Sequence, residues 1–128
     1  MRRQWHVYYQ PALANCVAAL KPQGCLTVSI LHPCFEEAGS AWKDKGYVEV
    51  RDYFHERAIK QDYGYFIHRP LSCYINSIIQ AGCVLQQLIE PQLDHAIAAQ
   101  HQAERYWSVP GYLLICATRS LQGSAGEG

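Results

Sequence analysis

The side chains of this chain that could do chemistry stand at two places, each next to a proline. His32, Cys34 and Phe35 follow the apolar run 25–31 in "HPCF", and His68 lies in "IHRP". Histidine changes its charge near neutral pH, so His32 and His68 are candidates for taking up or delivering a proton. The alternative is that each ring is only a hydrogen-bonding group at a hinge or a helix end.

Two other kinds of chemistry are open to the same groups. Cys34 leaves the apolar run into a loop and is the cysteine to test for reactivity, with an inert thiol as the alternative. A metal held by His32, Cys34 and His68 would make a small metal-binding module, although the spacing is unlike that of structural zinc sites. The six cysteines include no C-x-x-C pair, and most lie in apolar runs, as reduced thiols that pack as small hydrophobes do.

The totals predict one globular domain. The chain has 128 residues, of which 49% are hydrophobic and 17% are charged. Eleven basic residues balance eleven acidic ones, so we expect neither nucleic acid nor a membrane surface as a partner. No apolar run reaches the roughly 18 residues of a membrane span, and the first ten residues lack the apolar core of a signal peptide. A cytoplasmic protein is therefore predicted.

A helix and a strand must position His32. Pro11 suits the first turn of a helix that extends to Leu20, and "KPQG" at 21–24 closes it. The apolar stripe of this helix is Leu13, Cys16, Val17 and Leu20. Residues 25–31 follow as a strand, and its two apolar or small faces predict helices on both sides.

Residues 36–69 break the pattern and are predicted to form a long lid or binding loop. The rings gathered there are Trp42, Tyr47, Tyr53, Phe54, Tyr63, Tyr65 and Phe66. A long aromatic loop after a strand is more typical of a lid than of a linker. Alternation over 48–53 predicts a short strand within it.

Regular elements return after the lid. Leu71, Tyr74, Ile75, Ile78 and Ile79 form a helical stripe. Pro70 marks the start of that helix, Ser72 is its candidate cap and Gly82 ends it. A strand from 83 to 89 is stopped by Pro91. A polar helix over 95–107, a last strand over 111–119 and a flexible tail over 120–128 complete an α/β layered sheet.

Four segments, "LANCVAALKPQGCLTVSILHPCF", "HRPLSCYINSIIQAG", "LIEP" and "VPGYLLICATR", together resemble the C-terminal half of a class I S-adenosylmethionine-dependent methyltransferase of the small-molecule type. The resemblance implies a partial Rossmann-like sheet whose strands are equivalent to the fifth, seventh and sixth of that fold, the seventh antiparallel. Residues 1–119 would be the methyltransferase-like portion, with flanking helices and the lid at about 36–69.

The same resemblance implies that the cofactor-binding half is missing. The family cradles its cofactor in a glycine-rich turn, where glycine lets the backbone approach the ligand closely. No G-x-G precedes Gly24 in this chain. S-adenosylmethionine is the implied cofactor, yet no cofactor-binding or metal-binding residue can be assigned. The chain is thus expected to be a methyltransferase by resemblance but inactive alone, or else a non-catalytic interaction subunit or remnant.

In such a sheet, ligands lie beyond the carboxyl ends of the strands, which would place His32 at the rim of a small-molecule substrate pocket. The implied catalytic residues are His32 and His68. The implied substrate-binding residues are Cys34, Phe35, Trp42, Tyr53, Arg69 and Tyr74. Arg69 could equally form an ion pair with Glu36, Glu37 or Glu90, and Tyr74 could equally be core.

The resemblance also predicts an exposed edge. Without the missing half, strand 25–31 would lose its neighbour on one side, and an unpaired apolar edge promotes association. We expect a second copy or a partner chain to pair with it, or the segment Met1–Gln10 to cover it.

Overall fold

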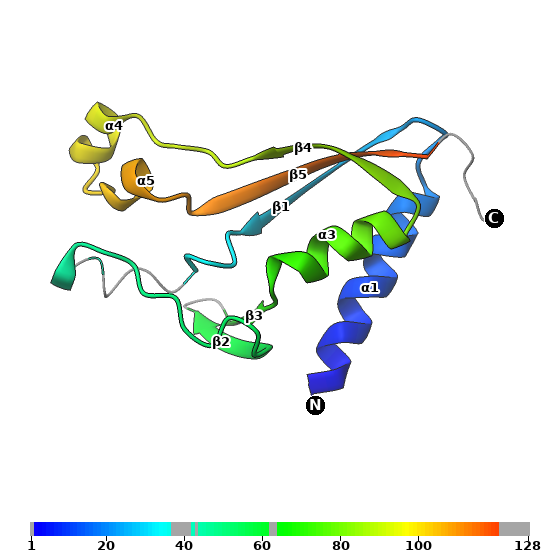
Figure 1. Cartoon of the computed structure of the whole chain (residues 1–128), viewed down its shortest axis with the longest axis horizontal. Helices are drawn as coiled ribbons and strands as arrows, with labels where there is room; N and C mark the ends of the chain where they lie inside the picture. The colour runs from blue at the N-terminus through cyan, green and yellow to red at the C-terminus, as the bar shows by residue number, and fades with distance from the viewer. Residues whose placement is uncertain (1, 37–41, 43, 62–63, 121–128) are drawn as a thin grey trace.

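The computed structural model describes residues 2–36, 42, 44–61 and 64–120, and it shows a three-stranded sheet, a hairpin and packed helices (Figure 1). In chain order the elements are α1 (Arg2–Ala18), β1 (Cys25–Leu31), β2 (Arg57–Gln61), β3 (Gly64–His68), α3 (Leu71–Gln80), β4 (Cys83–Ile89), α4 (His95–Gln100), α5 (Arg105–Ser108) and β5 (Tyr112–Arg119).

The main sheet has the order β1-β5-β4, with β5 antiparallel to both neighbours. Strands β1 and β4 are therefore parallel to each other. The register pairs Thr27 with Cys116 on one side of β5 and Leu85 with Ala117 on the other, and β4 carries a bulge between Leu85 and Gln87. The order and directions are those predicted for a partial methyltransferase sheet, while the equivalence of each strand to a numbered family strand stays a prediction.

The core lies between the sheet and two helices, α1 and α3, which lie on the same side of it (Figure 1). Its buried members are Leu13, Val17, Tyr74, Ile78, Cys83, Leu113, Ile115 and Ala117. On β1, Leu26, Val28 and Ile30 pack against this core, whereas Cys25, Thr27 and Ser29 are exposed. In the described part of the chain, helices thus cover one face of β1, not the two that its composition predicted.

Helix α1 begins earlier than predicted. It starts at Arg2, so Pro11 lies in its interior, where the missing N–H removes one backbone hydrogen bond. Leu13 and Val17 face the core, but Cys16 is exposed. Residues 2–10 are helical and lead away from the sheet, so they do not pair with β1 as a covering strand (Figure 1).

The turn between α1 and β1 needs a glycine for space. Gln23 adopts the left-handed conformation with φ of 68°, while a Cβ on Gly24 would lie 2.8 Å from the carbonyl oxygen of Lys21. The turn is tied to the end of β5, because Gln23 N–H donates to Arg119 O and Arg119 N–H donates to Gly24 O. Close approach of two backbone segments is what excludes a side chain at Gly24.

The predicted lid contains a hairpin that its aromatic content obscured. β2 and β3 pair antiparallel, from Arg57 with His68 to Gln61 with Gly64. The strand predicted over 48–53 is absent. Asp52 there has φ of 53°, which is incompatible with an extended strand.

Helix α3 matches its predicted stripe, with Tyr74 and Ile78 buried, but Ser72 makes no capping hydrogen bond. The helix predicted over 95–107 is divided into α4 and α5, because Gln102 has φ of 55° and ends the first helical run. The tail 121–128 lies outside the described residues. Among the helices that the structure describes, none combines the length and the apolar character that crossing a membrane requires.

Candidate functional site

The candidate site lies where two parallel strands end. His32 directly follows β1 and Glu90 directly follows β4, so both lie at the same edge of the sheet. The start of β5 lies between them, and His32 N–H donates to Gly111 O at 3.0 Å. Gly111 cannot carry a side chain, because a Cβ would lie 2.3 Å from the ring of Tyr106.

His32 is buried, with 5% of its surface exposed, and both of its ring nitrogens have partners. Its Nδ1 accepts the backbone N–H of Cys34 at 3.2 Å and so carries no proton in this arrangement. Nε2 must then carry the proton and donate it to Glu90 Oε2 at 2.8 Å. His32 is therefore held as a neutral ring of one tautomer, with Phe35 packed beside it at 4.8 Å between ring centroids.

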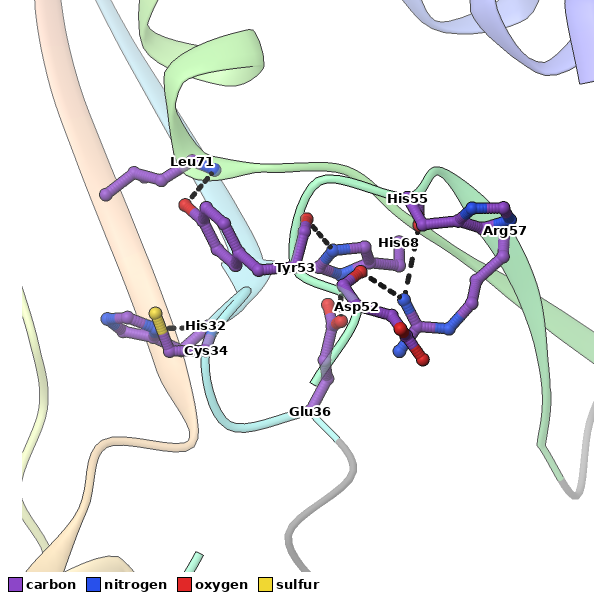
Figure 2. Close-up of polar contacts among 9 residues, drawn as sticks. All are labelled: His32, Cys34, Glu36, Asp52, Tyr53, His55, Arg57, His68 and Leu71. Carbon is purple, nitrogen blue, oxygen red and sulfur yellow. Dashed lines mark hydrogen bonds and ion pairs between the residues drawn. The ribbon is translucent and has the colours of Figure 1, made fainter. Parts of the chain in front are cut away.

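His68 lies in a second cluster, which is separate from His32 and Cys34 (Figure 2). Its ring is 1% exposed, and Nε2 donates to the carbonyl oxygen of Tyr53 at 2.7 Å. Nδ1 contacts a carboxylate oxygen of Glu36, whose side chain is 4% exposed. Both nitrogens are again occupied, so the ring holds the start of the lid and residue 53 against the end of β3.

Tyr53 ties the same loop to helix α3. Its hydroxyl oxygen accepts the N–H of Leu71 at 2.8 Å, which satisfies one of the backbone donors that a helix leaves open at its start (Figure 2). Arg57 holds the turn before β2 by donating to the carbonyls of Asp52 and His55. The hydroxyl of Tyr53 thus accepts an open N–H at the start of α3, a role that the sequence had assigned to Ser72.

Arg69 is engaged in an ion pair that the sequence did not predict. Its Nε lies 3.0 Å from Glu56 Oε2, and both side chains are largely buried. Glu90 contacts His32, Glu36 contacts His68, and Glu37 lies outside the described residues. The structural option for Arg69 fits this geometry, and its partner Glu56 was not among the three carboxylates expected.

Tyr74 belongs to the core, as the alternative to a pocket role anticipated. It is 5% exposed and sits in the cluster between α3 and the sheet. Burial raises the pKa of its hydroxyl, and the neighbouring Arg69 opposes part of that shift. Trp42 is half-buried, and its carbonyl accepts Gly46 N–H at 2.9 Å.

Cys34 is half-buried beside two carboxylates. Burial raises the pKa of its thiol, and the charges of Glu36 and Glu90 raise it further. A protonated thiol is a poor nucleophile, which favours the inert alternative. The space enclosed by Pro33, Cys34, Glu36, His68 and residues of the loop is only about 10 Å³. The side chains at the predicted rim of the substrate pocket therefore leave almost no free space between them.

Three carboxylates were missed as site residues: Glu36, Glu56 and Glu90. Each pairs with a predicted basic group. A usable signal existed for Glu90, since Glu90-Pro91 ends β4 as His32-Pro33 ends β1. Within the described residues, no group of three or more His, Cys, Asp or Glu side chains is placed to hold a metal ion, so His32, Cys34 and His68 do not converge as one.

Solved structures share this fold over part of their length. One is a protein from Listeria monocytogenes assigned as an S-adenosylmethionine-dependent methyltransferase, with a TM-score of 0.70 and 22% identity over 88% of this chain and 55% of that one. Another is an S-adenosylmethionine-dependent methyltransferase from Mesorhizobium loti, with a TM-score of 0.71 and 22% identity over 86% of this chain and 54% of that one. No family model matches the sequence, and no curated protein matches it significantly.

The chain therefore has an α/β fold that matches part of the fold of these methyltransferase structures. The chain spans about half the length of the solved structures that it matches.

Proposed function

We propose that this chain is the substrate-side part of an S-adenosylmethionine-dependent methyltransferase that acts on a small molecule. The observation that carries the proposal is the fold, which superposes on two structures described as S-adenosylmethionine-dependent methyltransferases, one of them by assignment alone, over more than four fifths of this chain. The polar groups gathered where β1 and β4 end support it, because ligands of open α/β sheets bind at that edge. A cytoplasmic location belongs to the same proposal.

The space beside Cys34 and His68 does not fit the cofactor. It is about 10 Å³, which has room for one water molecule but not for a nucleoside. We accordingly propose that residues outside this chain bind S-adenosylmethionine, and that this chain alone does not transfer methyl groups.

Isothermal titration of the purified chain with S-adenosylmethionine tests the proposal. We expect no saturable binding by the chain alone, and saturable binding once a polypeptide with the glycine-rich half of the fold is added. Saturable binding by the chain alone would overturn the claim of a missing half. Absence of binding with every such polypeptide would favour the alternative, a non-catalytic interaction subunit or remnant.

For the histidines, the geometry favours the structural alternative over proton transfer. Each ring has both nitrogens occupied by protein partners, so a substrate proton would have to displace one of them. We propose that His32 positions Glu90 and that His68 anchors the lid. A catalytic role for either ring would be supported if His32→Ala or His68→Ala abolished turnover of the completed enzyme without changing its stability.

The partner is proposed to pair with β1. In the described part of the chain β1 has a neighbour on one side only, β5, and Thr27 and Ser29 on its open face are exposed. A second copy of the chain, or the polypeptide that supplies the cofactor half, would satisfy the other edge.

A further inference from the structure

A cavity lies beside Glu90, away from the closed space around His68. The segment after β4 and the segment before β5 face each other across about 200 Å³, with residues 90–92 on one wall and residues 107–110 on the other. The cavity is large enough for a small organic molecule, and none of its lining residues was predicted as a site residue from the sequence.

Hydrogen bonds hold the two walls at a fixed separation. Gln92 Nε2 donates to the carbonyl oxygen of Trp107 at 2.8 Å, and Leu93 N–H donates to Tyr106 O at 2.9 Å. The ring of Trp107 is further fixed by His95, which contacts it edge-on at 5.0 Å. Asp94 caps α4 through the N–H groups of residues 96 and 97, so the next element is also anchored. The cavity is thus part of the fold and not a gap between loose loops.

The charge on its wall is negative. The Glu90 side chain is 57% exposed and accepts one hydrogen bond, from His32 Nε2. Because His32 Nδ1 accepts the Cys34 N–H, the ring donates as a neutral group and does not cancel the carboxylate charge. No lysine or arginine is among the residues that line the cavity. The carboxylate is held in place and open to a ligand.

The opposite wall consists of Trp107, Ser108, Val109 and Pro110, and so offers an indole ring beside one polar and two apolar side chains. Trp107 is 43% exposed. An indole ring attracts cations more strongly than the other aromatic side chains do, and a carboxylate forms charge-assisted hydrogen bonds with an ammonium group. Both walls select for positive charge on a small molecule with an apolar part.

We propose that this cavity binds a small organic cation, an amine or ammonium compound, with its nitrogen at the Glu90 carboxylate and its apolar part against Trp107. His32 acts as a positioning residue, because its Nε2 holds the Glu90 carboxylate by a hydrogen bond. The site stands independently of methyl transfer, because its evidence is the cavity itself.

Titration of the ¹⁵N-labelled chain with benzylammonium, followed by amide and indole NMR shifts, tests the site. We expect saturable shifts at the amides of residues 90, 92 and 107–109 and at the indole N–H of Trp107, with the indole of Trp42 unchanged. Benzyl alcohol has nearly the same shape without the charge and is expected to bind at least tenfold more weakly. Equal affinity for the two compounds, or no saturable shift with benzylammonium, overturns the proposal.

Glu90→Gln is the sharpest variant, because its amide oxygen can still accept the His32 hydrogen bond while the charge is lost. We expect its affinity for benzylammonium to fall by about tenfold, or about 1.4 kcal/mol. Glu104→Gln makes the same change of net charge on an exposed side chain that does not line the cavity, and it should bind as the native chain does. An equal loss in both variants would show only a general charge effect and overturn the site. Trp107→Leu should also weaken binding, and unchanged affinity there would count against the aromatic wall.

Discussion

At the scale of single residues, three buried basic side chains of this protein contact carboxylates. His32 contacts Glu90, His68 contacts Glu36, and Arg69 pairs with Glu56. In the first pair the Glu90 carboxylate is exposed, whereas in the second pair both side chains are buried. Such a difference in exposure separates a group that a ligand can reach from a group that holds the fold.

Removal of His68 should therefore destabilise the protein. His68→Ala would leave the buried Glu36 carboxylate without its imidazole, and breaking a buried pair in this way costs about 3 kcal/mol or more. Urea denaturation measures the change in the free energy of unfolding. The matched control is His55→Ala, an exposed ring in the same loop, which should change that free energy by no more than about 0.5 kcal/mol. Similar losses in both variants would contradict an anchoring role for His68.

The environment of Cys34 predicts a slow thiol. A raised pKa means a smaller thiolate fraction at pH 8, so iodoacetamide should modify Cys34 at least about tenfold more slowly than the exposed Cys25. Mass spectrometry of a timed reaction measures both rates. The rate at Cys34 should keep rising with pH above 9.0, the ordinary pKa of a thiol, because its own ionisation comes later. Glu90→Gln should speed the reaction, since it removes one of the charges that raise the pKa. Equal rates at Cys34 and Cys25 in the native chain would show that burial does not protect Cys34.

At the scale of elements, helix α3 depends on a residue from outside it. The hydroxyl of Tyr53 takes the N–H of Leu71, a contact between the lid and the first residue of the helix. The N-cap position itself is Pro70, which offers no side-chain acceptor. The loop and the helix should consequently lose structure together.

Tyr53→Phe removes that acceptor while keeping the ring. We expect a loss of about 1 kcal/mol in the free energy of unfolding, the usual contribution of one such hydrogen bond, together with faster amide exchange at Leu71. Tyr65→Phe on the exposed hairpin is the control, because its side chain is 71% exposed. Unchanged exchange at Leu71 in Tyr53→Phe would show that solvent replaces the hydroxyl without loss.

The elements with a clear hydrophobic period were predictable from the sequence. β1 and α3 lie where the apolar pattern placed them, and β4 and β5 differ by at most one residue at an end. The hairpin β2-β3 was not predicted, because five residues per strand give too short an alternation to outweigh the aromatic content of the loop. The break between α4 and α5 depends on one residue with positive φ, Gln102, which no hydrophobic period reports.

Most of the candidate site needed the three-dimensional arrangement. The sequence indicated His32 and His68 by their residue type and position, but it could not show which carboxylates meet them. Those partners are distant along the chain: Glu90 is 58 residues from His32, and Glu36 is 32 residues from His68. Contacts of that kind follow from the crossing of strands and not from local spacing.

At the scale of the whole molecule, one face of the main sheet and its two outer edges, on β1 and β4, are open in the described part of the chain. α1 and α3 cover the other face, and β5 pairs only one edge of β1. This chain covers only 55% and 54% of the matched structures, so those proteins continue well beyond the shared part of the fold. We expect the surface around β1 to bind protein.

Association through β1 is therefore predicted. Light scattering of the native chain should give a mass above that of one chain of 14.5 kDa, with slow amide exchange along residues 25–31.

Lysines at Thr27 and Ser29 place charge on the open face and should return the chain to a monomer. Lysines at Ala96 and Ala99 on the exposed surface of α4 add the same charge and should not. A monomeric native chain with fast exchange along 25–31 would contradict pairing, and a monomer with slow exchange would indicate that the chain covers this edge itself.

The bulge in β4 has a consequence for how the sheet ends. Before it, Leu85 lies opposite Ala117, and after it Leu88 lies opposite Ile115, so the alternation of inner and outer side chains shifts by one residue. That shift turns position 90 toward the face that His32 shares with Ile30 and Val28. A β4 that paired without the bulge, with Gln86 opposite Cys116, would send Glu90 to the opposite face and part it from the imidazole. The contact between Glu90 and His32 thus depends on the one extra residue that the bulge adds to β4.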